Sequence, residues 1–192
     1  DAAKEQLKWK PGEDKVPCLK LDNEKIVPNA PKIVYQDTSI KKLNFYWADQ
    51  VQSIELARLL ISDLDLRHCF LLKELNVQDC PVISICFPER PYIRSISIEH
   101  CPLAGFSLPN TQSLEALNLA YTDLEEFSLP TAPVLTHLSL TGSPISVLNL
   151  KALSNLEYLI LENIRINTFD TAAIPNLKGL KITDTSLREL DL

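Results

Sequence analysis

Residues 113–130, SLEALNLAYTDLEEFSLP, decide the fold because they contain the same apolar spacing twice. The first half ends in the pair Leu117 and Leu119, and the second half ends in Phe127 and Leu129. Two apolar residues separated by one other residue have the period of an extended strand with one buried face. The stretch therefore predicts two short extended segments that bury faces of the same kind.

The pair Leu117 and Leu119 recurs at every step of 21 residues in both directions, without insertion or slip. The eight pairs begin at residues 33, 54, 75, 96, 117, 138, 159 and 180. Four further columns of mostly apolar residues keep the same register. A unit of this length cannot bury its apolar face alone, so its neighbours must stack against it. The sequence therefore predicts a solenoid of eight units.

Each unit reads L-x-x-L-x-L-x-x-(C/T/S)-x-L-x-x-L-x-L-P, and in this the chain resembles leucine-rich-repeat proteins. It is most similar to a short bacterial type whose repeats of 21 residues contain similar halves of 10 and 11 residues. The resemblance implies a right-handed, mostly β solenoid with parallel strands on a concave face and extended or 3₁₀ segments on the convex side. We divide the chain into a charged N-terminal segment or cap, 1–29, and the repeat array, 30–192. Such a motif identifies a fold and not a function.

One column departs from the pattern of that family, which usually has Asn, sometimes Cys, five residues after the first strand leucine. There the side chain bonds the backbone of the turn. Six of the eight units here have Thr, Ser or Cys in this column, but the other two have Leu59 and Ile164. Because an aliphatic side chain cannot make the bond, we expect these two turns to be irregular.

The cysteines favour a reducing compartment. There are five of them, an odd number, and none forms a CxxC motif, which argues against a disulfide-stapled secreted domain. Cys80 and Cys101 occupy equivalent positions in neighbouring units. We favour buried thiols there, and leave open a disulfide between them or a metal site that adds His100.

Charge and hydropathy narrow the partners. A net charge of −6 argues against nucleic acid and against anionic lipid. No apolar run approaches the roughly 18 residues of a membrane span, so we expect no membrane insertion. The chain starts DAAKEQLKWK, without methionine and without the apolar core of an export signal. We expect it to be a mature product or a piece of something longer.

The sequence offers no catalytic constellation. No Ser/His/Asp or Cys/His set converges, no glycine-rich phosphate loop is present, and Glu125 and Glu126 read as a solvated turn. We therefore predict that the chain is not an enzyme and that it needs no cofactor or metal.

The solvent side of the strand sheet is the predicted binding surface. Small residues in the middle units make a low floor, and amphipathic aromatic side chains rise around it, as at interface anchors. The predicted partner-binding residues are Glu99, His100, Asn118, Tyr121, His137, Tyr158, Ile160 and Glu162.

We expect a protein-binding module, plausible as the recognition domain of a larger bacterial effector or regulator. It would act in the cytoplasm, or in the host cytoplasm for a secreted effector. The alternative is a cell-surface adhesin or a structural spacer. The final repeat has no cap, which suggests end-to-end self-association.

Overall fold

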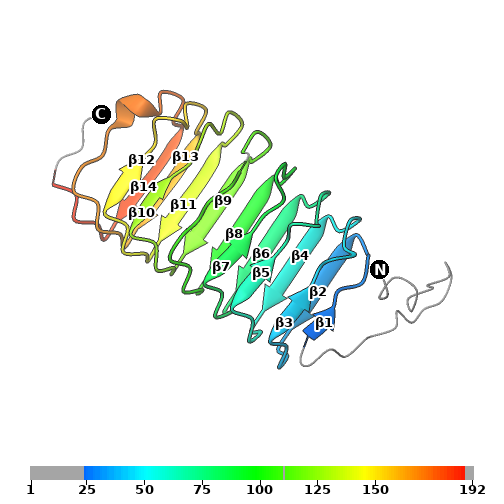
Figure 1. Cartoon of the computed structure of the whole chain (residues 1–192). Coiled ribbons are helices and arrows are strands. Elements are labelled where there is room, and N and C mark those ends of the chain that lie inside the picture. The colour runs from blue at the N-terminus through cyan, green and yellow to red at the C-terminus, as the bar shows by residue number, and fades with distance from the viewer. Residues whose placement is uncertain (1–23, 110, 189–192) are drawn as a thin grey trace.

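The structure is a computed structural model that describes residues 24–109 and 111–188. Within these ranges, eight parallel strands lie side by side along the long axis of the molecule (Figure 1). Each strand pairs with the equivalent residues one repeat away, so that Leu138 lies between Leu117 and Leu159. The strands, in spatial order, are β2 (Lys32–Gln36), β4 (Ser53–Ala57), β6 (Glu74–Gln78), β8 (Ser95–Glu99), β9 (Ala116–Ala120), β11 (His137–Thr141), β13 (Tyr158–Glu162) and β14 (Gly179–Thr183).

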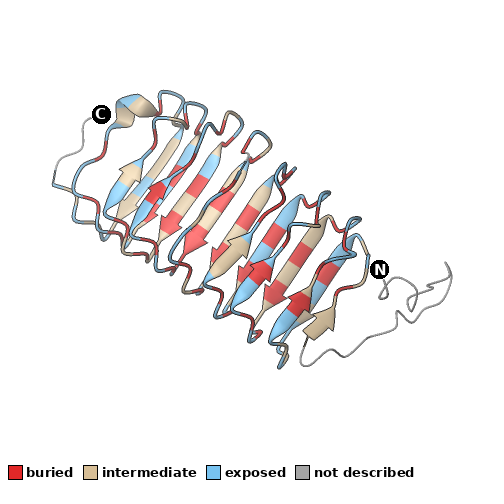
Figure 2. Cartoon of the chain, viewed as in Figure 1, coloured by how far each residue is buried: buried red, intermediate tan, exposed pale blue. Residues whose placement is uncertain are grey.

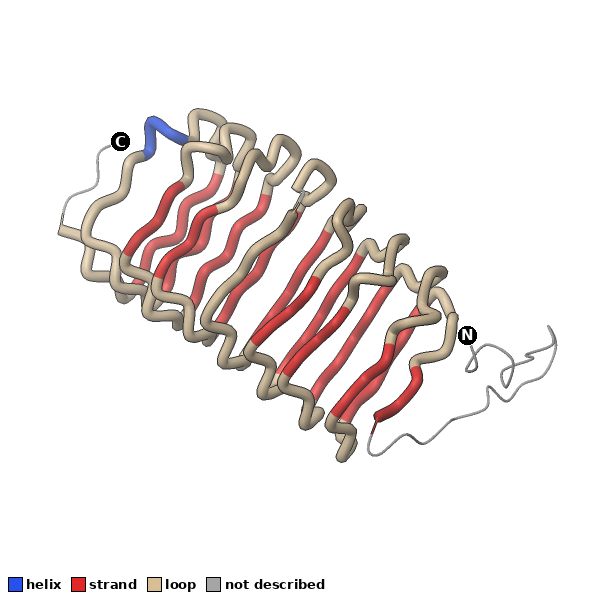
Figure 3. The backbone as a smooth tube through the Cα atoms, viewed as in Figure 1, coloured by secondary structure: helices blue, strands red, loops and turns tan. Residues whose placement is uncertain are grey.

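The opposite side of each coil returns through extended chain and short strands (Figure 3). These pair into two-stranded parallel sheets, and one 3₁₀ turn, η1 (Thr171–Ala173), follows them. The prediction of a mostly β leucine-rich-repeat solenoid is confirmed. No helix within the described ranges is long and apolar enough to span a membrane. The short strands are β1 (Glu24–Ile26), β3 (Lys42–Asn44), β5 (Asp63–Asp65), β7 (Ser84–Cys86), β10 (Glu126–Ser128) and β12 (Val147–Asn149).

The N-terminal part of the described chain lies on the return side of the first coil. β1 pairs in parallel with β3, and Val27, which follows β1, is buried. Leu19 and Leu21, which the sequence also suggests as capping residues, lie outside the described residues.

The core runs between the two sides of the coils as one continuous cluster. Along each long strand, buried residues alternate with residues that face solvent, as the banding of the strands in Figure 2 shows. In β11, Leu138 and Leu140 are buried, while His137, Ser139 and Thr141 are not. This period-two pattern sorts each repeat into one set of residues that stacks the coils and another that is free to vary on the surface.

The residue after each long strand turns the chain out of the sheet with a positive φ. The angle lies between 50° and 65° at all eight positions. In seven of these residues the backbone N–H donates to a carbonyl of the next coil, as in Arg58 N to Gln78 O at 3.0 Å. The positive-φ residues are Asp37, Arg58, Asp79, His100, Tyr121, Gly142, Asn163 and Asp184.

The expectation of irregular turns at Leu59 and Ile164 is wrong. The preceding residues, Arg58 and Asn163, have φ of 54° and 51°, like their equivalents, and both aliphatic side chains are buried. The turn needs no polar side chain of its own, because the backbone bond to the next coil holds it. Leu59 N–H also donates to the Cys80 sulfur, 3.4 Å away in the next coil. A hydrophobic residue here therefore adds to the core and leaves the turn intact.

The core column predicts a large effect of a single truncation. Leu138→Ala removes a fully packed side chain between two neighbouring leucines and should lower the free energy of unfolding by about 2–5 kcal/mol. Chemical denaturation followed by circular dichroism measures it. Val147→Ala, at a side chain that is 58% exposed, is the control and should change stability by less than about 0.5 kcal/mol. Equal stability of the Leu138→Ala variant and the wild type would contradict this packing.

Candidate functional site

The strand face is the solvent side of the eight-stranded sheet together with the positive-φ residues that follow the strands. The structure places all eight predicted site residues on it. His137 and Tyr158 are the first residues of β11 and β13, whereas His100 and Tyr121 directly follow β8 and β9. The two aromatic groups therefore stand at opposite ends of the strands, with the floor of small and polar residues between them.

His100 and Tyr121 form a parallel stack at the end where the strands leave the sheet. Their ring centroids are 4.5 Å apart and the planes differ by 8°. On its other side the Tyr121 ring covers Gly142, where a Cβ atom would overlap it. His100 Nδ1 lies 3.6 Å from Asp79 Oδ1. The ring of Tyr121 is thus fixed between its neighbours, and the side chain still leaves 49% of its surface in solvent.

His137 and Tyr158 form a second stack at the start of the strands. Their centroids are 4.7 Å apart with an interplanar angle of 20°. Thr136 Oγ1 lies 2.9 Å from His137 Nδ1, and Gly179 provides the room that the Tyr158 ring needs. Tyr158 remains 43% exposed. The same arrangement, histidine then tyrosine then glycine in consecutive coils, thus occurs twice in different columns.

A hydrogen-bonded network lies on the floor between the stacks. Ser97 Oγ donates to Glu99 Oε1 at 3.0 Å, and Asn118 Nδ2 donates to the same oxygen at 2.7 Å. Asn118 Nδ2 also lies 3.0 Å from Ser97 Oγ. These contacts fix the carboxylate of Glu99 over β8 and β9. Of the predicted residues, the structure therefore brings Glu99 and Asn118 into direct contact.

Ile160 and Glu162 lie on β13, further toward the C-terminal end of the array. Ile160 is 37% exposed on the strand face. Glu162 accepts an ion pair from Lys181 of β14 at 2.7 Å. Its charge is thus already matched within the chain, so Glu162 is the predicted residue least available to a partner.

The conformation of the first stack costs free energy. His100 and Tyr121 both have φ of 52°. Left-handed backbone costs roughly 1–2 kcal/mol for most residues, and only Gly, with Asn and Asp less often, adopts it readily. Asp, Asn or Gly occupies five of the other six positions, and the sixth, Arg58, is paired with Asp37. The fold alone does not account for an aromatic side chain at either of these two positions.

A shallow groove borders the second stack. Thr136 and Glu157, which line it, directly precede His137 and Tyr158, and Glu157 is paired with Lys178 at 2.6 Å. Asn155 and Asn176 line it further along. The groove extends the strand face over the edge where the strands begin.

A second exposed aromatic group was not identified from the sequence. It lies on the turns that lead from the return side back to the sheet in the first three coils. Tyr46, Phe70 and Tyr92 are 53%, 52% and 61% exposed, and Tyr46 lies 4.8 Å from the Trp47 ring and 4.6 Å from the ring of His68. The signal was available as aromatic residues outside the repeat columns. We call Tyr46, Trp47, Phe70, Leu71 and Tyr92 the turn cluster.

The cysteines do not contribute to the strand face. Cys80 and Cys101 are free and buried, which confirms the prediction of buried thiols. His100 lies outside the core with half of its side chain in solvent, so it does not converge with them. Within the described ranges no group of three or more His, Cys, Asp or Glu residues is arranged to hold a metal ion.

Burial suppresses the reactivity of these thiols. It raises the pKa of Cys69 to about 12 and that of Cys101 to about 11, and it also raises the pKa of Cys80. Only the thiolate reacts, so in a Cys18→Ser variant we expect one fast-reacting thiol near neutral pH, the exposed Cys86. Ellman's reagent measures it, and denaturant should release the other three. Two or more fast thiols in the native protein would contradict the burial described here.

The glycine beneath Tyr158 should control the second stack. In Gly179→Ala, the added Cβ would lie 2.8 Å from Tyr158 Cδ1, so the exposed ring must move. Since Gly179 sits in a strand without a positive φ, we expect little loss of stability and a clear change in the ring-current shifts of His137 and Tyr158. NMR spectra of the aromatic protons test this. Unchanged shifts at both rings would show that the glycine does not position the stack.

Comparison with known proteins supports the fold. No protein-family model matches the sequence, and no curated protein does. Among solved structures, the chain is similar to one described as the functional domain of InlJ from Listeria monocytogenes, which includes a cysteine ladder, with 20% identity and a TM-score of 0.59. The match covers 84% of this chain and 41% of the InlJ chain, so this chain spans less than half of that length. The likeness shows that the chain folds as a leucine-rich-repeat solenoid; the short bacterial repeat subtype stays a prediction.

Proposed function

We propose that the chain is a protein-binding module that docks a protein partner on its strand face. The observation that carries the proposal is the pair of exposed histidine–tyrosine stacks, each backed by a glycine, on an otherwise low and regular surface. Exposed aromatic side chains with a polar edge are common anchors of protein interfaces.

Rigidity makes these aromatics suitable anchors. A side chain that is mobile before binding loses roughly 0.5–1.5 kcal/mol of rotamer freedom when an interface immobilises it. Tyr121 and Tyr158 are already held by the stacked histidine on one side and the glycine backbone on the other. Much of that cost is therefore met when the solenoid folds.

The backbone of His100 and Tyr121 supports the same function. Residues in sparsely populated regions of φ and ψ persist where the surrounding structure holds them, and they cluster at binding sites. The two residues keep a positive φ at a position where Asn, Asp or Gly would be less costly. Binding supplies a reason for aromatic side chains at these positions.

The charge of the face favours a protein over a nucleic acid. Among the described residues, the outward positions of the four central strands, β6, β8, β9 and β11, contain no Lys or Arg. Phosphate backbones are bound mainly by such cations.

The wider context of the module is also part of the proposal. We propose that it is the recognition domain of a larger effector or regulator that acts in a reducing compartment. That a solved structure with this fold is described as the functional domain of InlJ supports a working role for the array over that of a passive spacer. A cell-surface adhesin is the second candidate, and a spacer would need neither aromatic stack.

A pull-down with quantitative mass spectrometry tests the proposal. Wild type is compared with a Tyr121→Ala/His137→Ala/Tyr158→Ala variant whose fold is verified by circular dichroism. We expect at least one protein to be enriched by the wild type and reduced about tenfold or more by the variant, because truncating an anchor costs about 2 kcal/mol or more.

The turn cluster provides the matched control. Tyr46→Ala/Phe70→Ala/Tyr92→Ala also removes three exposed rings, but none from the strand face. It should retain the captured protein. Loss with this control and retention with the strand-face variant would move the binding surface to the turn cluster. Identical capture by all three proteins would refute docking through either surface.

A further inference from the structure

Glu99 is a carboxylate that the chain orients but does not neutralise. Its Oε1 atom accepts hydrogen bonds from Ser97 and Asn118, both of which are uncharged. Neither Lys nor Arg forms an ion pair with it among the described residues, and its Oε2 atom receives no hydrogen bond from them. The side chain is half-buried between the coils. Glu99 is therefore fixed in place with one acceptor oxygen free.

The carboxylates toward either end of the strand face are treated differently. Glu55 is paired with Lys32 at 2.7 Å, and Asp37 is paired with Arg58. Glu162 is paired with Lys181 at 2.7 Å. The chain thus supplies cations to both ends of this surface and withholds them from the centre, where Glu99 lies.

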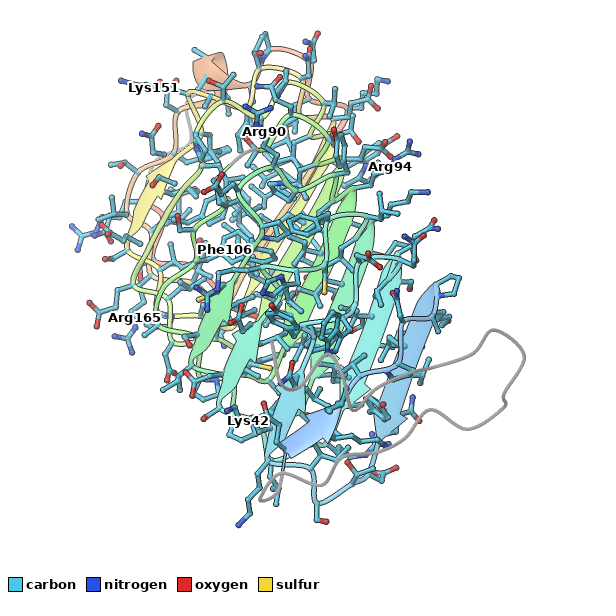
Figure 4. All side chains as sticks on the ribbon, turned by 45° about the vertical axis from the view of Figure 1, so that its right-hand side comes forward. Lys42, Arg90, Arg94, Phe106, Lys151 and Arg165 are labelled. Atoms are coloured by element: carbon cyan, nitrogen blue, oxygen red, sulfur yellow. The ribbon has the colours of Figure 1, made fainter. Side chains whose placement is uncertain are left out.

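The surroundings of Glu99 leave room for an incoming group. Its neighbours across the sheet are Gln78 of β6 and Ala120 of β9, and the alanine has no side chain long enough to cover the carboxylate. The stack of His100 and Tyr121 begins at the next residue and forms a wall beside it. Several of the chain's cations lie elsewhere: Figure 4 shows Lys42, Lys151 and Arg165 projecting from the return side and the turns.

We propose that Glu99 receives an arginine or lysine side chain of the protein partner, seated between the Ser97–Asn118 network and the His100–Tyr121 stack. The inference rests on the proposed function and names the chemistry of the partner. A basic segment of a protein supplies the charge that the centre of the strand face lacks. A charge-assisted hydrogen bond to a fixed carboxylate is about twice as strong as a neutral one, and it strengthens as the partner excludes water.

Asp79 adds to the same region. Its carboxylate lies 3.6 Å from His100, within electrostatic range of Arg58. The cation at Glu99 would therefore also meet a second negative charge across the histidine ring. This makes a cationic side chain a better occupant than a neutral hydrogen-bond donor.

An NMR titration with defined peptides tests the assignment. The probe is a short peptide of alternating arginine and glycine, and the matched probe replaces each arginine by citrulline, which keeps the shape and removes the charge. With ¹⁵N-labelled wild type, we expect the arginine peptide to shift the Asn118 side-chain amide and the backbone amides of Ser97, Glu99, His100 and Tyr121. The citrulline peptide should leave these signals in place.

Two variants decide whether Glu99 is responsible. Glu99→Gln keeps an oxygen that Ser97 and Asn118 can bond, and it removes the charge; the affinity for the arginine peptide should fall about tenfold. Glu126→Gln removes the same charge from an exposed position on the return strand β10 and should change the affinity by less than about twofold. Similar losses in both variants, equal shifts from both peptides, or no shift at these residues would overturn the inference.

The partner test separates this inference from the proposed function. A protein that is captured by the wild type, lost with the aromatic variant and retained in full by Glu99→Gln would leave the binding module standing and refute the role of Glu99. Loss with both variants supports both. If the captured protein is a second copy of this chain, shown by a shift in molar mass on light scattering, the cation must come from that copy, and the same two glutamate variants apply.

Discussion

The burial of each coil by the next is the constraint on which the rest of the structure depends. An isolated repeat would leave its paired apolar residues in water, whereas the stack places Leu138 between Leu117 and Leu159 and joins the coils by a ladder of backbone hydrogen bonds. The offset between neighbours must stay constant, because a slip of one residue would turn the apolar set toward solvent. This is why the repeat contains no insertion over the eight long strands.

The sequence predicts the inward half of this structure well and the outward half poorly. The two periods, 2 within a strand and 21 between strands, locate the long strands and the core columns, since burial leaves few choices of residue type. The turns are harder. The Leu59 turn looked defective because its side chain cannot accept a hydrogen bond, yet the acceptor comes from Cys80 in the next coil. Spacing along one repeat does not reveal a bond that is made between two.

Site prediction had the same limit. The columns placed all eight candidate residues on one face, but only coordinates show that His100 stacks on Tyr121 and His137 on Tyr158. Register could not show that Glu162 is paired with Lys181 while Glu99 is bonded by neutral groups alone, because both are simply outward glutamates in the same column. Residues outside the columns received little attention, which is how the turn cluster around Tyr46 and Tyr92 was missed.

A regular solenoid makes departures from regularity informative. Folding fixes the inward columns and the positive φ after each strand, but it places almost no demand on the outward side chains. A residue there that folding would disfavour therefore needs another explanation. His100 and Tyr121 carry a left-handed backbone, and Gly142 makes room for the second ring at the cost of flexibility in the unfolded chain. Glu99 is held by two neutral donors in a region without cations. These departures lie next to one another, although the 21-residue repeat does not require it, and a partner that contacts this part of the strand face accounts for them together.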